Sequence, residues 1–248
     1  GDDSGIGAAA RAINDGEAEA ALETLRDPER TDTQWRRPLN PRSPSKTFVD
    51  AVRDGFRDYL SRLDRPDEAL AAFDGFRILC ALRRGPFGAP AVNTLVEKIL
   101  ADSGLIRPSG TWYPGRPVMI TRNDYPLRLF NGDIGITAPD PEAGGDLRVW
   151  LPAADGGLRK LHPRRLPEHE TVYAMTVHKS QGSELSRVML ILPDRPAPVL
   201  TRELLYTGIT RAREQVEIHG GVPIFRQAVA NRIERSSGLR DALWGESM

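Results

Sequence analysis

The sequence predicts an α/β fold, in which a parallel β-sheet is flanked by helices and carries a small inserted β-barrel. Short continuous apolar runs at 76–82, 172–175 and 188–192 lie next to helical patterns. Such runs are typical of strands that are buried on both faces of a parallel sheet. Between the first two runs, over 124–168, shorter apolar segments are separated by turn dipeptides such as Asn131-Gly132, which indicate β-hairpins.

The first 72 residues have helical periodicity, and helices are predicted at about 48–60 and 66–73 among others. The segment 26–45 is rich in Pro, Arg and Asp, which predicts a solvated loop. We therefore expect residues 1–72 to form a helical linking segment.

The run 76–82 is the first predicted strand of the sheet. It is followed by a polar turn that contains Arg83 and Arg84, and then by a helical pattern over 91–101. Turns between a buried strand and the next helix are where such sheets present functional groups. The two arginines are therefore either solvated surface residues or ligands of a phosphate group.

The predicted barrel, 124–168, is too short to be stable alone, so we expect an insertion within the larger domain. Its surface is either simply solvated or in contact with a DNA backbone. The basic residues on which the second interpretation depends are Arg159, Lys160, Arg164 and Arg165.

Strand and helix patterns resume after the barrel. Strands are predicted at 172–175, 188–192 and 216–219, and helices at 202–212 and 222–235, with a mobile tail over 236–248. Two polar clusters lie among them. The first, 176–184, contains hydrogen-bond donors and a glycine that permits close approach of a ligand. The second, 206–213, contains Arg211 and Arg213, which suit planar recognition of phosphate.

The composition sets limits on function. The chain of 248 residues has 34 basic and 34 acidic residues, so bulk charge gives no support to nucleic-acid binding and any DNA contact must be local. The single cysteine, Cys80, lies in an apolar run, which predicts a buried thiol and leaves no cysteine metal site. No apolar run approaches the ~20 residues of a membrane span and no signal peptide opens the sequence, so a cytoplasmic location is expected.

Together, the clusters 176–184 and 206–213 resemble motifs V and VI of superfamily 1 helicases. Further stretches resemble the RecD-type helicases, the alpha subunit of bacterial exodeoxyribonuclease V, and the resemblance covers nearly the whole chain. These stretches are Asp3-Ser4-Gly5-Ile6-Gly7, Leu79-Cys80-Ala81-Leu82-Arg83, Gly85-Pro86-Phe87-Gly88, Gly115-Arg116-Pro117-Val118-Met119-Ile120, Leu129-Phe130-Asn131-Gly132-Asp133-Ile134-Gly135 and Leu166-Pro167-Glu168-His169-Glu170.

The resemblance implies a RecA-like second motor domain, of the P-loop-NTPase type, formed by 73–123 and 169–235. The inserted barrel, 124–168, would be the SH3-like element of the family. No Gly-Lys pair occurs in the sequence, so the P-loop that holds the nucleotide phosphates is absent. We therefore expect the chain to be the C-terminal portion of a longer protein.

The resemblance also implies roles at a nucleotide site. Arg211 would be the motif VI arginine that stabilises the γ-phosphate in the transition state. Arg83 would be the motif IV arginine with a similar task, although the arginine after it competes for that role. Glu184 would bind the ribose, and Gln181 and Gly182 would couple the nucleotide to the DNA.

At the DNA, the resemblance assigns phosphate contacts to Thr176, His178 and Lys179, supported by the basic residues of the barrel. The alternative for His178 and Glu184 is a purely structural polar role.

The expected activity is ATP-dependent movement 5′ to 3′ along single-stranded DNA, with ATP and Mg²⁺ as cofactors and RecB-like and RecC-like subunits as partners in double-strand-break repair. The metal ligands would come from the missing N-terminal half, and the fragment alone would be inactive. Two alternatives stay open: a solitary RecD-like helicase, and a non-catalytic DNA-binding or interaction module.

Overall fold

The computed structural model describes residues 4–154 and 156–233, so the predicted tail, 236–248, lies outside the described residues. The first of its two sheets is entirely parallel and confirms the α/β class. In spatial order its strands are β1 (Thr33–Arg36), β10 (Ala212–His219), β9 (Leu185–Ile191), β2 (Phe76–Cys80) and β8 (Ala174–Thr176).

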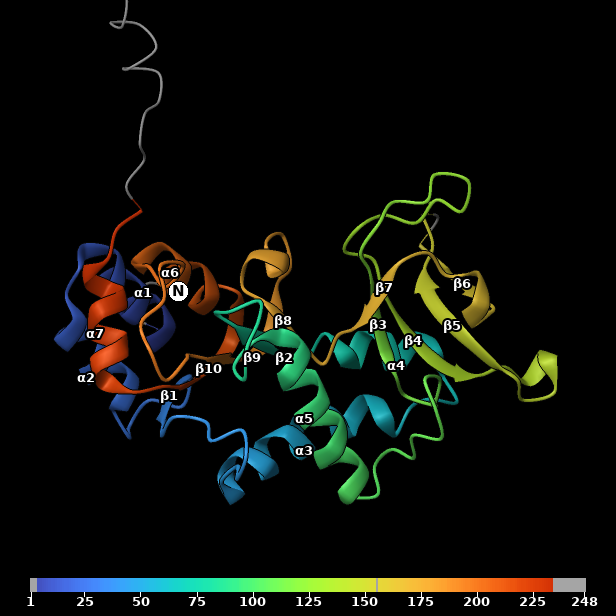
Figure 1. The fold of residues 1–248 in the computed structure, drawn as a ribbon, viewed down its shortest axis with the longest axis horizontal. Helices are drawn as coiled ribbons and strands as arrows, with labels where there is room; N and C mark the ends of the chain where they lie inside the picture. Colours follow the sequence, from blue (N-terminus) through green and yellow to red (C-terminus); the bar gives the residue numbers. More distant parts are fainter. Residues whose placement is uncertain (1–3, 155, 234–248) are drawn as a thin grey trace, which may run out of the picture.

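The helices gather in two groups around this sheet (Figure 1). One group lies beside β1 and β10, and the other beside β2 and β8. The first group consists of α1 (Gly5–Asp15), α2 (Ala18–Arg26), α6 (Arg202–Ile209) and α7 (Val222–Ala230). The second consists of α3 (Lys46–Leu60), α4 (Pro66–Phe73) and α5 (Ala89–Asp102).

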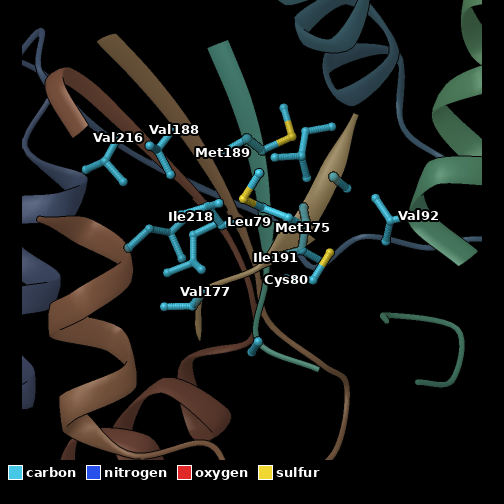
Figure 2. Packing of buried hydrophobic residues seen from close by; sticks show 14 of the residues in the cluster. Leu79, Cys80, Val92, Met175, Val177, Val188, Met189, Ile191, Val216 and Ile218 are labelled. Atoms are coloured by element: carbon cyan, nitrogen blue, oxygen red, sulfur yellow. The ribbon is translucent and has the colours of Figure 1, made fainter. Parts of the chain in front are cut away.

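Side chains from both faces of the sheet join the helices in one apolar core (Figure 2). Leu79 and Ile191 lie within it, and Val92 of α5 approaches from the side of β2. The same core extends from Ile6 to Val229. The N-terminal helices therefore pack into the main body, in addition to the linking role expected of residues 1–72.

Strand β1 corrects the prediction of a solvated loop over 26–45. It pairs in parallel with β10 at the edge of the sheet, and Trp35 packs edge-on against Phe225 with ring centroids 5.2 Å apart. Arg36 pairs with Glu217 at 3.3 Å. A four-residue edge strand in which only Trp35 is apolar has almost no apolar periodicity, which explains why the sequence did not reveal it.

The second sheet is antiparallel and has the order β6–β5–β4–β3–β7. It has a small core of its own, formed by Val118, Ile120, Leu129, Val149 and Leu151. The strands are β3 (Pro117–Ile120), β4 (Ile134–Pro139), β5 (Leu147–Pro152), β6 (Leu158–Leu161) and β7 (His169–Thr171).

All five strands fall between α5 and β8 in the sequence, so this sheet is inserted in the chain that forms the first one. However, β3 and β7 lie outside the expected limits of 124 and 168, and they pair with each other. The sequence analysis had assigned both segments to the larger domain. The structure places them in the inserted sheet, because the hairpins between 124 and 168 need both strands to complete their pairing.

Within the part of the chain that is described, no helix has the length and apolar character needed to cross a membrane.

Candidate functional site at the two ends of the parallel sheet

The predicted site residues are divided between the two ends of the first sheet. Thr176 closes β8 at the carboxyl end, level with Cys80 of β2 and Ile191 of β9. Glu184 immediately precedes β9 and Arg211 immediately precedes β10, at the amino end, where Leu185 and Ala212 are paired. Motif V therefore spans both ends of the sheet, and its last residues, Ser183 and Glu184, meet motif VI at the amino end.

A cleft of about 820 Å³ lies at the carboxyl end. Four predicted residues line it together: Arg83, Thr176, His178 and Lys179. Polar residues of α5 and the β7 segment line its other walls. Because three of these residues come from motif V and the fourth from the turn after β2, the structure assembles them from two separate stretches of sequence.

The turn after β2 holds Arg83 and Arg84 out in the solvent. Gly88 donates a backbone hydrogen bond to Gly85 at 3.0 Å, and a Cβ on Gly88 would lie 2.6 Å from backbone atoms of Arg84. Glycine is therefore required at 88 for the turn to close. Neither arginine makes a side-chain hydrogen bond or ion pair with any described residue, and both line the cleft.

Motif V is held by its own hydrogen bonds. The Thr176 hydroxyl accepts the backbone N–H of Lys179 at 3.3 Å, which closes the 3₁₀ turn η3 (His178–Ser180). The Lys179 ammonium pairs with Glu170 at 2.6 Å. The charge of Lys179 is therefore partly compensated, whereas His178 is exposed.

Asn93, on α5, is a functional candidate that sequence analysis missed. Its side-chain amide donates to the Ala174 carbonyl at 2.9 Å, and its side-chain oxygen accepts the Ala174 N–H at 2.8 Å. The Asn93 side chain thus takes the place of a neighbouring strand at the edge of β8. It bonds to Ala174, which lies two residues before Thr176. Its position on the buried face of a helical pattern was the available signal, because a polar residue there needs a partner.

At the amino end, Arg211 lies beyond the last residue of α6, because the helix ends at Ile209 and not at 212 as predicted. Its guanidinium donates to the Thr207 and Ser183 carbonyls, at 3.3 Å each. No described carboxylate lies within ion-pair distance of it. A half-buried guanidinium whose charge is not compensated suits an incoming phosphate.

Glu184 has a partner that the sequence did not suggest. Its carboxylate pairs with Arg213, and both side chains are largely exposed. Arg213 lies in β10, so it is not a charge at a helix terminus. Ser183 and Glu184 also line a small pocket of about 170 Å³ with Asp74 and Arg77.

Arg77 was likewise missed. It is fully buried, its guanidinium stacks 3.9 Å from the Phe73 ring centroid, and it donates to Asp74 at 3.3 Å. Burial lowers the pKa of Arg77 to about 10. The i, i+3 spacing of Asp74 and Arg77 before an apolar strand was the only sequence signal.

The structure does not bring Arg83 together with Arg211. Arg83 follows the carboxyl end of β2, and Arg211 precedes the amino end of β10. Strands of this length separate the two ends by about 20 Å, at about 3.3 Å per residue. Arg83 and Arg211 therefore lie at opposite ends of the sheet, because linear motif order does not show at which end of a strand a residue lies.

Gln181 and Gly182 lie between the two ends, in the loop 177–184. Gly182 has φ +85°, a conformation that other residues adopt only with strain. Gln181 lines a pocket of about 230 Å³ with Thr207 of α6 and His178. The loop therefore contacts the cleft, this pocket and the amino end in turn.

The four basic residues of the inserted sheet do not form one surface. Arg159 donates to the carbonyls of Leu127 and Arg128, at 2.6 and 2.9 Å. Lys160 pairs with Asp140 at 2.8 Å and also with Glu142. Neighbouring side chains on a strand point to opposite faces of the sheet. Arg159 and Lys160 therefore lie apart, and each is bound to partners within the inserted sheet. The expected DNA contacts of Arg159 and Lys160 would therefore require both side chains to leave their present partners.

Arg164 and Arg165 remain exposed, in the 3₁₀ turn η2 (Pro163–Arg165), and their side chains have no partner among the described residues. Over the described ranges, 4–154 and 156–233, no group of three or more His, Cys, Asp or Glu residues could hold a metal ion.

Comparison with known proteins identifies the family. Residues 171–218, which contain motifs V and VI, match the model of the UvrD-like helicase C-terminal domain. The RecBCD enzyme subunit RecD of Mycobacterium tuberculosis is 40% identical over 236 residues, or 95% of this chain and 40% of that protein. The ATP-dependent RecD2 DNA helicase of Deinococcus radiodurans is 32% identical over 170 residues, or 67% of this chain and 23% of that protein.

Among solved structures, the Pif1 helicase from Candida albicans matches at a TM-score of 0.41 and 16% identity, over 93% of this chain and 64% of that one. The chain spans about two-fifths of the length of the RecD subunits that it matches. On the sequence matches, which confirm the resemblance given by the motifs, the chain belongs to the RecD-type superfamily 1 helicases and corresponds to their C-terminal region.

Proposed function

We propose that this chain is the C-terminal motor half of an ATP-dependent DNA helicase subunit. It would move 5′ to 3′ along single-stranded DNA, within a RecBCD-type exodeoxyribonuclease V complex that processes double-strand breaks. The observation that carries the proposal is that motif V spans the two ends of one sheet and meets motif VI at the amino end. One end presents a cleft with exposed cations, and the other presents an uncompensated arginine.

The cleft at the carboxyl end is the proposed DNA site. Arg83 and Arg84 are its exposed cations, and His178 and Thr176 lie beside them. Contacts with a phosphate backbone need local positive charge, which a chain of net charge zero can supply only in such a place. We therefore assign Arg83 and Arg84 to DNA phosphates. The inserted sheet would be the SH3-like element, and the parallel sheet the second RecA-like domain.

The amino end is the proposed nucleotide site. Arg211 fits a phosphate, because both of its hydrogen bonds go to neutral carbonyls and leave its charge available. Glu184 would release Arg213 and hold the ribose instead. Gln181 and Gly182 would connect this site with the DNA. ATP with Mg²⁺ supplies the phosphoryl group whose transfer drives the motor. The P-loop and metal ligands would come from a first motor domain, so we expect no hydrolysis by this chain alone.

The test uses the full-length subunit, with steady-state ATPase measured at saturating single-stranded DNA. Arg211→Ala should lower kcat by about three orders of magnitude, as is typical of arginine fingers. Arg211→Lys should recover little, because an ammonium lacks the planar fork. Arg226→Ala is the matched control, since it removes an exposed charge that is paired with Glu19 and has no part in the proposed site. A folded Arg211→Ala protein with near-normal kcat would refute the assignment.

Two alternatives concern the whole protein. A solitary helicase is supported by the match to the RecD2 protein, which covers a smaller share of this chain than the RecD subunits do. A DNA-binding or interaction module without catalysis is supported by the missing P-loop. Co-purification of the full-length subunit with RecB-like and RecC-like proteins separates the first alternative from our proposal, and its ATPase activity separates the second.

A further inference from the structure

The loop 121–133, which joins β3 to β4, holds two aromatic rings in the solvent. Tyr125 is 71% exposed and Phe130 is 47% exposed. Their ring centroids are 6.3 Å apart, and the rings meet nearly edge to face. Exposed aromatic side chains of this size are costly to keep in water, so their pairing in one loop calls for a physical reason.

The loop is rigidly built around the rings. Asp124 and Leu129 exchange both backbone hydrogen bonds, at 2.8 and 2.9 Å, and the Leu129 side chain is fully buried in the core of the inserted sheet. The Asn123 side chain accepts the Asn131 N–H at 2.8 Å and donates to the Tyr125 hydroxyl at 3.4 Å. These contacts fix both ends of the loop with respect to each other.

Arg159 holds the centre of the loop. Its guanidinium donates to the carbonyls of Leu127 and Arg128, between the two rings in sequence. Arg128 itself has φ +50°, the only positive φ of a non-glycine residue in the described chain. The hydrogen bonds from the half-buried Arg159 hold Arg128 in this strained conformation, so the rings are presented in a fixed arrangement.

We propose that Tyr125 and Phe130 form a stacking platform for the bases of single-stranded DNA. Aromatic rings that are held in place bind bases of any sequence through their faces. The Arg128 side chain is exposed and has no partner among the described residues, so it can accompany the rings with a phosphate contact. The loop also projects from the same side of the molecule as the motif V loop, 177–184 (Figure 1). The inference rests on the proposed function and adds a second DNA contact to it.

The surroundings of the rings favour DNA over a protein partner. Their neighbours Asn123, Asn131 and Pro126 are exposed, and all but Pro126 are polar. The other large exposed apolar side chains of the described chain, Val199, Tyr206 and Ile233, lie in different elements. A protein interface needs a wider apolar centre around its aromatic anchors, whereas a base needs only a ring face and a nearby cation.

The experiment compares two single strands of about 15 nucleotides, a length within the usual range of such sites. One is oligothymidine, and the other is an abasic strand with the same phosphates. Binding to the 248-residue chain is followed by fluorescence anisotropy at several salt concentrations. In the test variant, Tyr125→Leu with Phe130→Leu, the rings are replaced by aliphatic side chains. Tyr125→Phe keeps the ring and is the control, and thermal melts show whether each variant is folded.

The double leucine variant should bind oligothymidine at least about tenfold more weakly than the wild type. Its binding to the abasic strand and its salt dependence should be unchanged, because the phosphate contacts remain. Tyr125→Phe should bind like the wild type. Equal oligothymidine affinity of wild type and double variant would overturn the proposal, as would an equal loss for both strands.

Two further results would also count against the platform. If the double variant keeps its DNA affinity but the full-length subunit carrying it no longer binds a RecB-like or RecC-like protein, the loop is a protein-docking surface. If the wild-type chain binds neither strand, the proposed DNA-binding function itself fails, and this is seen before any ring is replaced.

Discussion

Replacing Asn93 by alanine tests how the carboxyl end of the sheet, the proposed DNA site, is held. Asn93 is almost fully buried, and its side-chain amide makes two hydrogen bonds to the backbone of Ala174, at 2.8 and 2.9 Å. Ala174 is fully buried and lies in the edge strand β8, so no further strand can take over these bonds. Alanine at 93 would leave a buried N–H and a buried carbonyl without partners.

The magnitude follows from these two groups. A buried polar group without a partner costs about 1–3 kcal/mol, so with two such groups the variant should lose roughly 2–6 kcal/mol of the free energy of unfolding. The loss should be concentrated in β8, which runs directly into Thr176. Because His178 and Lys179 follow in the same segment, we also expect weaker binding of single-stranded DNA.

Urea unfolding measures the free energy, and hydrogen exchange of the Ala174 amide locates the change. That amide should be protected in the wild type and exchange much faster in Asn93→Ala. Thr94→Ala is the matched control: its hydroxyl bonds only to Pro90 of the same helix and is exposed, so it should change stability by about 0.5 kcal/mol or less. If the two variants had equal stability, the role assigned to Asn93 would be wrong.

Three shorter predictions concern other parts of the molecule. Cys80 should not react with a disulfide reagent in the folded chain, because burial raises the pKa of its thiol, and rapid labelling without urea would contradict this. Neutralising Arg164 and Arg165 should lower the log–log salt slope of single-stranded DNA binding by about 0.7 for each phosphate contact, and an unchanged slope would show that they are merely solvated. The hydrogen bond from Lys160 holds the pKa of Asp140 below its ordinary value of 3.8, so this stabilisation is present above that pH and is lost as the pH falls through the lowered pKa. Lys160→Met should therefore reduce the urea midpoint at about pH 7, and this reduction should shrink as the pH falls below 3.8; a reduction that does not depend on pH would refute the ion pair's role.

The buried strands and their helices could be predicted from the sequence, because apolar runs and helical periodicity reflect local burial. The run at 76–82 contains β2 (Phe76–Cys80), and the run at 188–192 overlaps β9. Strand β1 could not be predicted, since its place in the sheet depends on β10, which is far away in the sequence. The limits of the inserted sheet failed for the same reason: β3 and β7 acquire their partners only in the folded chain.

The candidate site was predicted as a set of residues but not as an arrangement. Motif V and Arg83 do meet in one cleft. Arg83 and Arg211, which were expected at one nucleotide site, lie at opposite ends of the sheet, because a motif does not show which end it will occupy. Similarly, Arg159 and Lys160 are adjacent in sequence, yet the alternation of a strand directs them to different partners. Charge pairing in three dimensions decides which cations remain available for DNA.

The loop 177–184 gives a physical reason why the two ends of the sheet can act together. Thr176, where the loop begins, is level with Ile191 of β9. The loop ends at Leu185, which is six residues before Ile191 on β9 and therefore about 20 Å away along the strands. With β2 lying between β8 and β9, the sideways step is about 10 Å, so the loop must span roughly 22 Å. Extended residues contribute at most about 3.5 Å each, and the 3₁₀ turn η3 contributes only about 2 Å per residue, which gives a reach of roughly 26 Å. The loop therefore has little slack. A displacement of His178 by DNA must either move Glu184 at the amino end or be absorbed at Gly182, the one residue of the loop with positive φ.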